Sequence, residues 1–331
     1  MRGGKSRGGA WLAWACLAAS GASVPGAAFA QAFPSKPTRL ITQFGPGAPG
    51  DLIARLVAQQ LSEVTGQPVV VDNRVGAGGV LALTAVARAA PDGYTLSVSN
   101  STVPVVSVVL AKTPPPFDPV KDLTPVTIVG DIATLIVASS TLPQNSLREV
   151  IDFAKSNPGK ISYGTTGVGG PQHMAGEQIR LLTGADLTHI PYKTSPVLDA
   201  ASGALQLAFV VSAQALPLIK AGKVKLVAVL ADSRFRLMPE VPTVTEVVPG
   251  FEPPPRWTAM FAPGGLPPAI LHRLHADIVK GMGSPQGRTR TIDLGFEPLT
   301  SKSPEEFAAQ VHREIELVAR IAKAANIPKT D

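Results

Sequence analysis

The feature that most constrains this chain is the regular alternation of short β-rich runs with helical runs. Residues 39–44, 67–73 and 95–100 are typical of strands, whereas residues 51–66 and 79–90 are typical of helices. Parallel strands need long crossover connections, and a helix usually provides them. The β-α-β-α-β order therefore predicts a parallel sheet that is covered by helices.

A second series of the same kind follows a proline-rich break at residues 112–119. The first series stops near residue 130 and is completed by the C-terminal part of the chain. We therefore predict an α/β fold of two lobes, each a mainly parallel sheet flanked by helices, with a ligand cleft between them. The first lobe is expected to comprise residues 31–131 plus 232–331, and the second lobe residues 132–231. The strand runs of the second series are 134–140, 160–166, 186–192, 205–211 and 223–231.

The first thirty residues have the pattern of a secretory signal peptide. Arg2, Lys5 and Arg7 form a positively charged start. Residues 10–20 then form an apolar stretch that is too short to remain as a membrane span, and residues 28–30 fit the small-residue cleavage pattern. We predict that residues 1–30 are a leader removed on export.

Cysteine content and charge exclude several functions. The one cysteine, Cys16, lies in the predicted leader, so the mature chain has no disulfide, thiolate metal site or cysteine nucleophile. The formal charge of +6 falls to +3 without the three basic residues of the leader. These charges are dispersed, without a basic stripe or interleaved aromatic residues, so nucleic acid is not expected as a partner.

Two loops rich in glycine stand where a predicted strand leads into a predicted helix. They are GPGAPG at residues 45–50 and GTTGVGGPQ at residues 164–172. Glycine lets the backbone approach a ligand closely, and the free N–H groups at a helix start favour an anion. Each loop is thus either a backbone anion site or only a turn stiffened by proline. Two such loops facing one cleft favour the anion site.

Motifs for other chemistries are absent or incomplete. Residues 75–79 and 167–172 both lack the third glycine of a dinucleotide-binding turn, and no phosphate-binding P-loop, nucleophile elbow or zinc-protease motif occurs. His272 and His275 share a helix face, yet a solvated surface explains them better than a metal site does. We therefore predict no cofactor and no metal. For a secreted α/β enzyme, the alternative reading, the candidate residues would be Ser101, Thr166 and His173.

The chain resembles the substrate-binding proteins of the tripartite tricarboxylate transporters, the Bug family of bacterial receptors. The resemblance runs collinearly over nearly all of residues 33–325. It is carried by residues 34–96 and by YGTTGVGGPQHMAGEQ, HIPYK, PEVPTVTE, WTAMFAPGGLP and SPEEFAAQVHREI. It implies a two-lobed periplasmic binding protein fold of type II, without catalysis, that closes on a carboxylate held by backbone N–H groups.

The resemblance also implies which residues contact the ligand. Loop positions of the family fall on both glycine loops, and the end of the third strand and the start of the helix after the second loop are expected to line the same cleft. The predicted ligand-binding residues are Phe44, Gly45, Gly47, Ala48, Asn100, Ser101, Thr102, Thr166, Gly167, Gly169, Gly170, His173 and Val210.

Three departures from the family pattern bear on the ligand. Gln43 stands where the first loop usually has proline, and Ala48 where it usually has a second glycine. Val210 occupies a position that is often aspartate, a natural partner for a ligand amine. Because an unpaired buried ammonium group is costly, we expect a carboxylate with an apolar or aromatic remainder, or a dicarboxylate, rather than an amino acid.

The predicted function is that of an extracytoplasmic solute receptor. Its partners would be a small carboxylate and either the membrane subunits of a permease or a membrane sensor kinase, and the sequence does not separate transport from sensing. We expect the receptor to act as a monomer.

Overall fold

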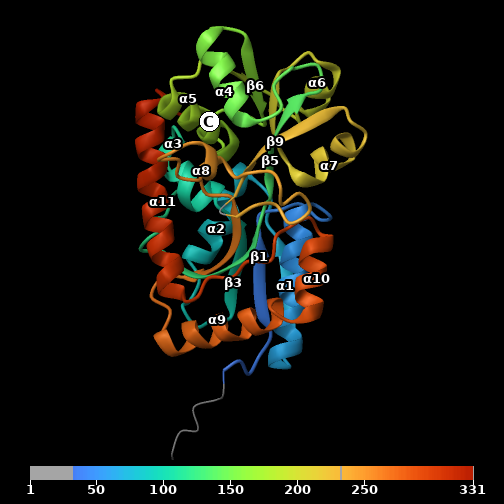
Figure 1. Ribbon diagram of the computed structural model, residues 1–331. Helices are drawn as coiled ribbons and strands as arrows, with labels where there is room; N and C mark the ends of the chain where they lie inside the picture. The colour runs from blue at the N-terminus through green and yellow to red at the C-terminus, as the bar shows by residue number, and fades with distance from the viewer. Residues whose placement is uncertain (1–32, 232, 331) are drawn as a thin grey trace, which may run out of the picture. The chain divides into compact units, whose positions relative to one another are not determined.

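The computed structural model describes residues 33–231 and 233–330, and the predicted signal peptide lies outside them (Figure 1). Within the described residues, none of the helices combines the length and the apolar character needed to cross a bilayer. Two five-stranded sheets, each flanked by helices, organise this part of the chain.

The first sheet has the strand order β2-β1-β3-β10-β4. β1, β2 and β3 are parallel, whereas β10 runs antiparallel to both of its neighbours, β3 and β4. Figure 1 shows α1 and α10 on one side of this sheet and α2 and α11 on the other. The strands are β1 (Thr38–Thr42), β2 (Val69–Asn73), β3 (Thr95–Asn100), β4 (Leu123–Asp131) and β10 (Trp257–Pro263). The helices are α1 (Pro49–Thr65), α2 (Val80–Ala87), α3 (Val108–Leu110), α9 (Pro268–Met282), α10 (Pro285–Asp293) and α11 (Pro304–Ala324), with short η1 (Ala77–Gly79) and η2 (Thr102–Ser107).

The second sheet repeats this arrangement with the order β7-β6-β8-β5-β9. β6, β7 and β8 are parallel, and β5 runs antiparallel to β8 and β9. The fourth strand of each sheet is thus the reversed one. The strands are β5 (Thr134–Ser139), β6 (Ile161–Thr165), β7 (Leu187–Pro191), β8 (Leu207–Val211) and β9 (Val224–Leu230). The helices are α4 (Leu147–Ser156), α5 (Pro171–Thr183), α6 (Val197–Ser202), α7 (Ser212–Lys220) and α8 (Val244–Val247).

This topology confirms the predicted α/β class with two mainly parallel sheets. The two reversed strands, β5 and β10, were not predicted as such. Their sequences are continuous apolar runs, which are typical of any strand buried on both faces and carry no information on direction.

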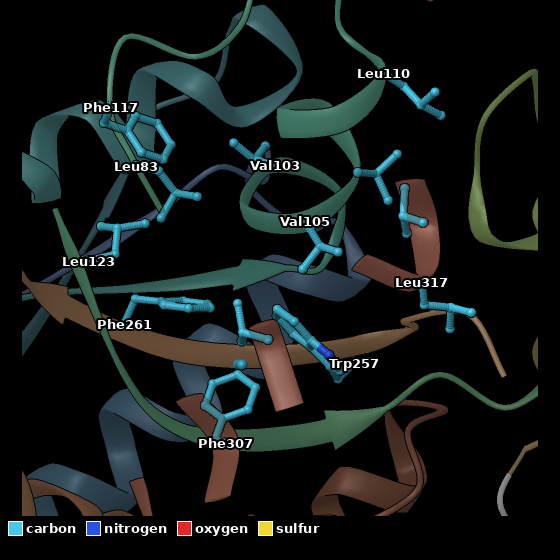
Figure 2. Close-up of a cluster of buried hydrophobic side chains, with 14 of the residues drawn as sticks. Leu83, Val103, Val105, Leu110, Phe117, Leu123, Trp257, Phe261, Phe307 and Leu317 are labelled. Atoms are coloured by element: carbon cyan, nitrogen blue, oxygen red, sulfur yellow. The ribbon is translucent and has the colours of Figure 1, made fainter. Parts of the chain in front are cut away.

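Alternating side chains place a separate core on each face of each sheet. In β10, Trp257, Ala259 and Phe261 join the cluster under α2 and α11, whereas Met260 and Ala262 join the cluster under α1 and α9. Successive side chains of a strand point to opposite faces, so one strand contributes to both cores. Figure 2 shows the first of these clusters, with Phe307 of α11 against the ring of Trp257.

The predicted lobe boundaries near residues 131 and 231 stay a prediction, and the packing of the segment after β9 bears on the second of them. After β9 the chain forms α8, whose Val244 and Val247 pack in the core of the second sheet together with Phe251. A backbone hydrogen bond from Val229 to Pro242 holds this segment to β9. These contacts favour assigning residues 242–251 to the second lobe rather than to the first.

One segment between β3 and α3 is wound more loosely than an α-helix. Thr102–Ser107 is a π-helical turn, in which the N–H of Val106 donates to the carbonyl of Ser101, five residues earlier, over 3.4 Å. Single π-turns are rare and occur often at functional sites. This turn directly follows β3 and brings Thr102 and Ser107 to the wall of a cavity.

Phe307 is expected to be a main stabilising contact of α11. It is fully buried and contacts the rings of Trp257 and Phe261. Phe307→Ala should lower the free energy of unfolding by about 3–5 kcal/mol, since it leaves a cavity that the rings cannot fill. Urea unfolding measures this loss. Glu316→Ala, on the exposed face of the same helix, should change stability by less than about 0.5 kcal/mol. Equal effects of the two substitutions would contradict this packing.

Candidate functional site

A cavity of about 780 Å³ is lined by elements of both sheets. From the first sheet come residues 100–102 at the end of β3, Val106 and Ser107 of the turn after it, and the proline-rich segment 113–116. From the second sheet come residues 166–172, which follow β6, and Val211 at the end of β8. Parallel strands of α/β proteins bind ligands beyond their carboxyl ends, and this cavity occupies such a place. Its volume lies within the ~300–1,000 Å³ of typical small-molecule sites.

The cavity brings together seven of the thirteen predicted ligand-binding residues. Those that line it follow β3 or β6 and are Asn100, Ser101, Thr102, Thr166, Gly167, Gly169 and Gly170. Those that do not line it are Phe44, Gly45, Gly47, Ala48, His173 and Val210. That any of these residues contacts a ligand stays a prediction.

The first glycine loop uses its own N–H groups internally. The N–H of Gly47 donates to the Asp51 carboxylate over 2.9 Å, and the N–H of Ala48 donates to the carbonyl of Gly45 over 3.1 Å. Ala48 is the N-cap of α1 and has a negative φ of −67°, so alanine fits there without strain. Asp51 lies in the first turn of the helix and fills the anion position of the loop.

Asp51 is fully buried and stays ionised because it is well paired. It accepts hydrogen bonds from the side chains of Arg55 and Asn73 as well as from Gly47. Burial alone would raise the pKa of this carboxyl group. The hydrogen bonds from Arg55, Asn73 and Gly47 outweigh that effect, so the pKa of Asp51 lies below its usual value. The convergence of Arg55, Asn73 and Gly47 on Asp51 depends on the folded structure and was not predicted from the sequence.

Gln43 connects the first loop to the cavity. Its amide donates to Oδ1 of Asn100 over 3.1 Å, and its carbonyl oxygen accepts from the hydroxyl of Ser99. Asn100 Oδ1 also accepts from the N–H of Thr102 over 3.2 Å. A proline side chain, usual in the family at this position, could neither donate to Asn100 nor accept from Ser99. The departure at Gln43 therefore orients Asn100, a residue that lines the cavity.

The end of β3 is anchored to the strand beside it. Ser101 donates its hydroxyl to the carbonyl of Pro255 over 3.0 Å and its N–H to the carbonyl of Trp257 over 3.1 Å. A hydroxyl committed to a carbonyl, without a basic partner, is not an activated nucleophile. The geometry therefore does not support Ser101 as a catalytic residue.

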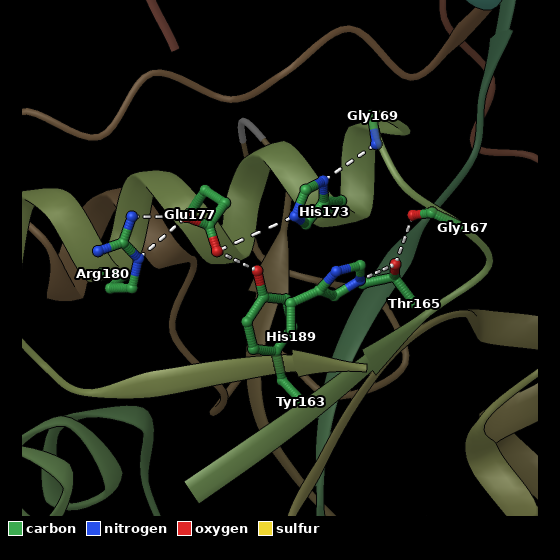
Figure 3. A network of polar contacts seen from close by, with 8 residues as sticks. All are labelled: Tyr163, Thr165, Gly167, Gly169, His173, Glu177, Arg180 and His189. Carbon is green, nitrogen blue, oxygen red and sulfur yellow. Dashed lines mark hydrogen bonds and ion pairs between the residues drawn. The ribbon is translucent and has the colours of Figure 1, made fainter. Parts of the chain in front are cut away.

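The second glycine loop is held from behind by two histidines (Figure 3). The N–H of Gly169 donates to Nδ1 of His173 over 3.0 Å. The hydroxyl of Thr165 donates to the carbonyl of Gly167 over 2.9 Å and lies 2.8 Å from Nε2 of His189. The rings of His173 and His189 stack with their centroids 3.9 Å apart. His173 thus supports the loop and lies behind its cavity-lining face.

These contacts fix the proton positions on both rings. His173 can accept from Gly169 only if its Nδ1 carries no proton. Since Thr165 has one proton and gives it to Gly167, Nε2 of His189 must donate to the Thr165 oxygen. His173 is therefore neutral, with its proton on Nε2, and His189 carries a proton on its own Nε2.

Burial favours the neutral state of both histidine rings. It lowers the pKa of His173, an effect that Glu177 opposes and Arg180 reinforces. Burial and the neighbouring His173 lower the pKa of His189 to about 4. Glu177 accepts from the Tyr163 hydroxyl over 2.8 Å and from Arg180 over 2.7 Å, which holds it beside His173. The loop therefore rests on a network of fixed side chains.

The structure also places Val210, which was predicted to contact the ligand, and His272 and His275, which were predicted to form a solvated surface rather than a metal site. Val210 is buried in a core cluster on one face of the second sheet, and the next residue, Val211, lines the cavity. His272 lies 3.4 Å from Glu305, and His275 contacts the carbonyl of Ser301. Across residues 33–231 and 233–330, no three histidine, cysteine or acidic side chains are grouped as metal ligands.

Sequence reasoning missed Arg256, which lines the cavity and forms an ion pair with Asp131 over 2.9 Å. Its side chain is only 7% exposed. The signal in the sequence was a lone arginine between three prolines and the apolar run of β10. Long charged side chains are rarely buried unless they are paired, so an arginine in such an apolar stretch indicates a specific role.

Comparison with known proteins decides the family. Residues 53–327 match the tripartite tricarboxylate transporter family receptor, TctC. The chain belongs to this family. It is also 35% identical to protein BugT of Bordetella pertussis over 310 residues. This alignment covers 93% of this chain and 94% of BugT. TctC proteins are receptors that bind solutes in the periplasm, and they are not enzymes.

Solved structures agree with this family and fold. The structure of Rpa4515 from R. palustris with adipate is 31% identical, with a TM-score of 0.71, and covers 89% of this chain and 99% of that one. MatC (Rpa3494) from Rhodopseudomonas palustris with bound malate is also 31% identical, with a TM-score of 0.66, and covers 87% of this chain and 99% of that one. These similarities confirm the predicted two-lobed periplasmic binding protein fold.

The histidine pair of this TctC receptor predicts an acid-sensitive stability. Because both folded-state pKa values lie below the ordinary 6.5, the unfolded chain binds more protons once the pH falls below about 6.5. The free energy of unfolding should therefore drop by about 1–2 kcal/mol between pH 7 and pH 5, as urea unfolding at both pH values can show.

A double variant isolates this effect. In His173→Asn with His189→Gln, each amide can replace the hydrogen bond of the ring it succeeds, but neither titrates. Its stability should change less between pH 7 and pH 5 than that of the wild type. His312→Asn, at an exposed position, should leave the profile unchanged. Identical profiles for the wild type and the double variant would exclude the pair as the cause.

Proposed function

We propose that this protein is a periplasmic receptor that binds a small organic carboxylate and passes it to a membrane permease of the tripartite tricarboxylate type. The observation that carries the proposal is the charge of the cavity wall. Among the described residues, its one charged side chain is that of Arg256, and no acidic side chain lines it. Because Asp131, the counter-ion of Arg256, does not line the cavity, such a wall favours an anionic ligand over a cationic one.

Uncharged donors add to this preference. Gly167 and Gly170 of the second glycine loop and Asn100 and Thr102 at the end of β3 line the cavity, whereas the N–H of Gly169 is already donated to His173. Preformed loops and strand ends of this kind can bind carboxylate oxygens without changing their own conformation. The two related structures with adipate and malate hold carboxylates, which agrees with a ligand of this class.

The family favours transport over sensing. Its description is that of a transporter receptor, so we propose permease subunits, rather than a sensor kinase, as the partner. Removal of residues 1–30 would release the receptor into the periplasm, where a monomer with one ligand cavity suffices for capture. The lobes, as predicted from the sequence, would close when the ligand contacts both of them.

Gly169 supports such a closing contact. It belongs to the second glycine loop, and a Cβ atom added to it would lie 2.9 Å from Cδ1 of Leu110 and 3.7 Å from Thr330. Its φ of +79° is also unfavourable for other residues. The loop after β6 thus packs closely on the segment after β3, at the edge of the cavity.

The first test of the proposal is ligand binding by the purified mature protein. Linear, branched and aromatic mono- and dicarboxylates, adipate and malate included, are screened by thermal shift, and those that bind are titrated by calorimetry. At a concentration of about 100 times Kd, a ligand that binds only the folded state adds about 2.7 kcal/mol to its stability. At least one acid should raise the melting temperature and be recovered unchanged. A panel without any shift would overturn the proposal.

The second test concerns the closing contact. Gly169→Ala should weaken the affinity of the acid that binds best by about tenfold, equivalent to ~1.4 kcal/mol. Gly159→Ala is the matched control, because Gly159 also has a positive φ, of +74°, but a Cβ atom there meets nothing within 4 Å. Both variants incur a conformational cost of about 1–2 kcal/mol. Equal affinities in the two variants would show that Gly169 has no special role in binding.

A further inference from the structure

Arg256 is set apart from every other residue of the cavity wall by its charge and its position. It directly precedes β10, whose register pairs Thr258 with Asn100 of β3. Ser101 bonds to the carbonyls of Pro255 and Trp257, the two residues that flank Arg256. Arg256 is therefore held beside the end of β3, next to the residues that line the cavity.

The counter-ion of Arg256 lies on the other side of it. Asp131 lines two smaller cavities, of about 80 and 230 Å³, but not the cavity of 780 Å³. Arg256 lines all three. Arg256 is thus shared by the ligand cavity and by the two smaller cavities that Asp131 lines. The backbone of Asp131 is itself fixed by two hydrogen bonds to Glu297, of 3.0 and 2.9 Å.

We infer that Arg256 binds the carboxylate of the ligand, and that the ligand has an apolar body without a cationic group. This inference rests on the proposed function and adds the recognition residue and the chemical class. Arginine is suited to the task because its planar group of donors matches a carboxylate and stays charged. The ion pair with Asp131 holds the side chain in place before the ligand arrives, which lowers the entropic cost of binding.

The rest of the wall defines the body of the ligand. Much of it is apolar, with Val106 and Val168 from the two sides and Pro114, Pro115 and Pro116 in succession. Proline has no N–H group to donate, so these three positions offer the ligand an apolar surface. Since no acidic side chain among the described residues lines the cavity, an ammonium group would be desolvated there without a counter-charge.

A series of six-carbon probes tests this inference on the wild-type protein. Hexanoate, hexanamide, adipate and 6-aminohexanoate share one chain length and differ only in their end groups. We expect hexanoate or adipate to bind at least roughly tenfold tighter than hexanamide and 6-aminohexanoate in calorimetry, because only the acids present a carboxylate without an amine. Hexanamide or 6-aminohexanoate binding as tightly as the acids would overturn the inference.

Two substitutions then test Arg256 itself, using the acid that binds best. Arg256→Gln should weaken its affinity by roughly tenfold to a hundredfold, because a charged hydrogen bond is lost. Arg256→Lys retains the charge but not the planar geometry and should lie between the wild type and Arg256→Gln. Arg234→Gln is the matched control, since Arg234 pairs with Glu246 and lines the 230 Å³ cavity but not the ligand cavity.

Folding is controlled separately, because Arg256→Gln removes the buried charge that pairs with Asp131. Combining it with Asp131→Asn removes both charges, and the melting temperature without ligand reports whether each variant is folded. The double variant should remain weak in binding. If acids bind the wild type and the folded double variant equally, the receptor function stands and Arg256 is not its recognition residue. If no acid in the larger panel binds the wild type, both proposals fail together.

Discussion

The insertion of β10 between β3 and β4 is the interaction on which the rest of this structure depends. β10 is made from a part of the chain more than one hundred residues beyond β4, and it pairs antiparallel with both neighbours. It completes the first sheet and contributes to the cores on both faces. It also delivers Arg256 to the end of β3. One strand therefore joins the distant halves of the first sheet and positions the charge of the cavity.

Much of the fold could be predicted from the sequence because the local patterns agree with the global arrangement. The strand runs of both series and the return of the chain to the first sheet follow from periodicity and turn residues. The direction of β5 and β10 could not be predicted, since a strand buried on both faces reads the same either way. The π-helical turn of Thr102–Ser107 was also not predicted, because such a turn has no simple sequence pattern.

The candidate site was predictable only where the backbone itself forms it. The glycines after β6 indicated the second loop. Asn100 to Thr102 were indicated by their place at the end of the third strand, because α/β sheets bind ligands beyond the carboxyl ends of their strands. The first loop looked equivalent, but Asp51 occupies its anion position, and this depends on how Arg55, Asn73 and Gly47 converge in space. The place of Arg256 in the cavity wall was not predicted for a related reason. It depends on the strand beside which Arg256 lies and not on its neighbours in sequence.

The stacked histidines behind the second loop have a consequence for observing the receptor at work. His173 and His189 are each fixed in one tautomer by contacts that reach Gly169, Gly167 and Thr165. A movement of the loop that breaks either contact removes the constraint on the tautomer of that ring. The nitrogen resonances of the two rings in NMR distinguish these forms. In protein labelled with nitrogen-15, these two rings therefore report on the contacts of the second glycine loop, without a fluorescent label or an introduced cysteine.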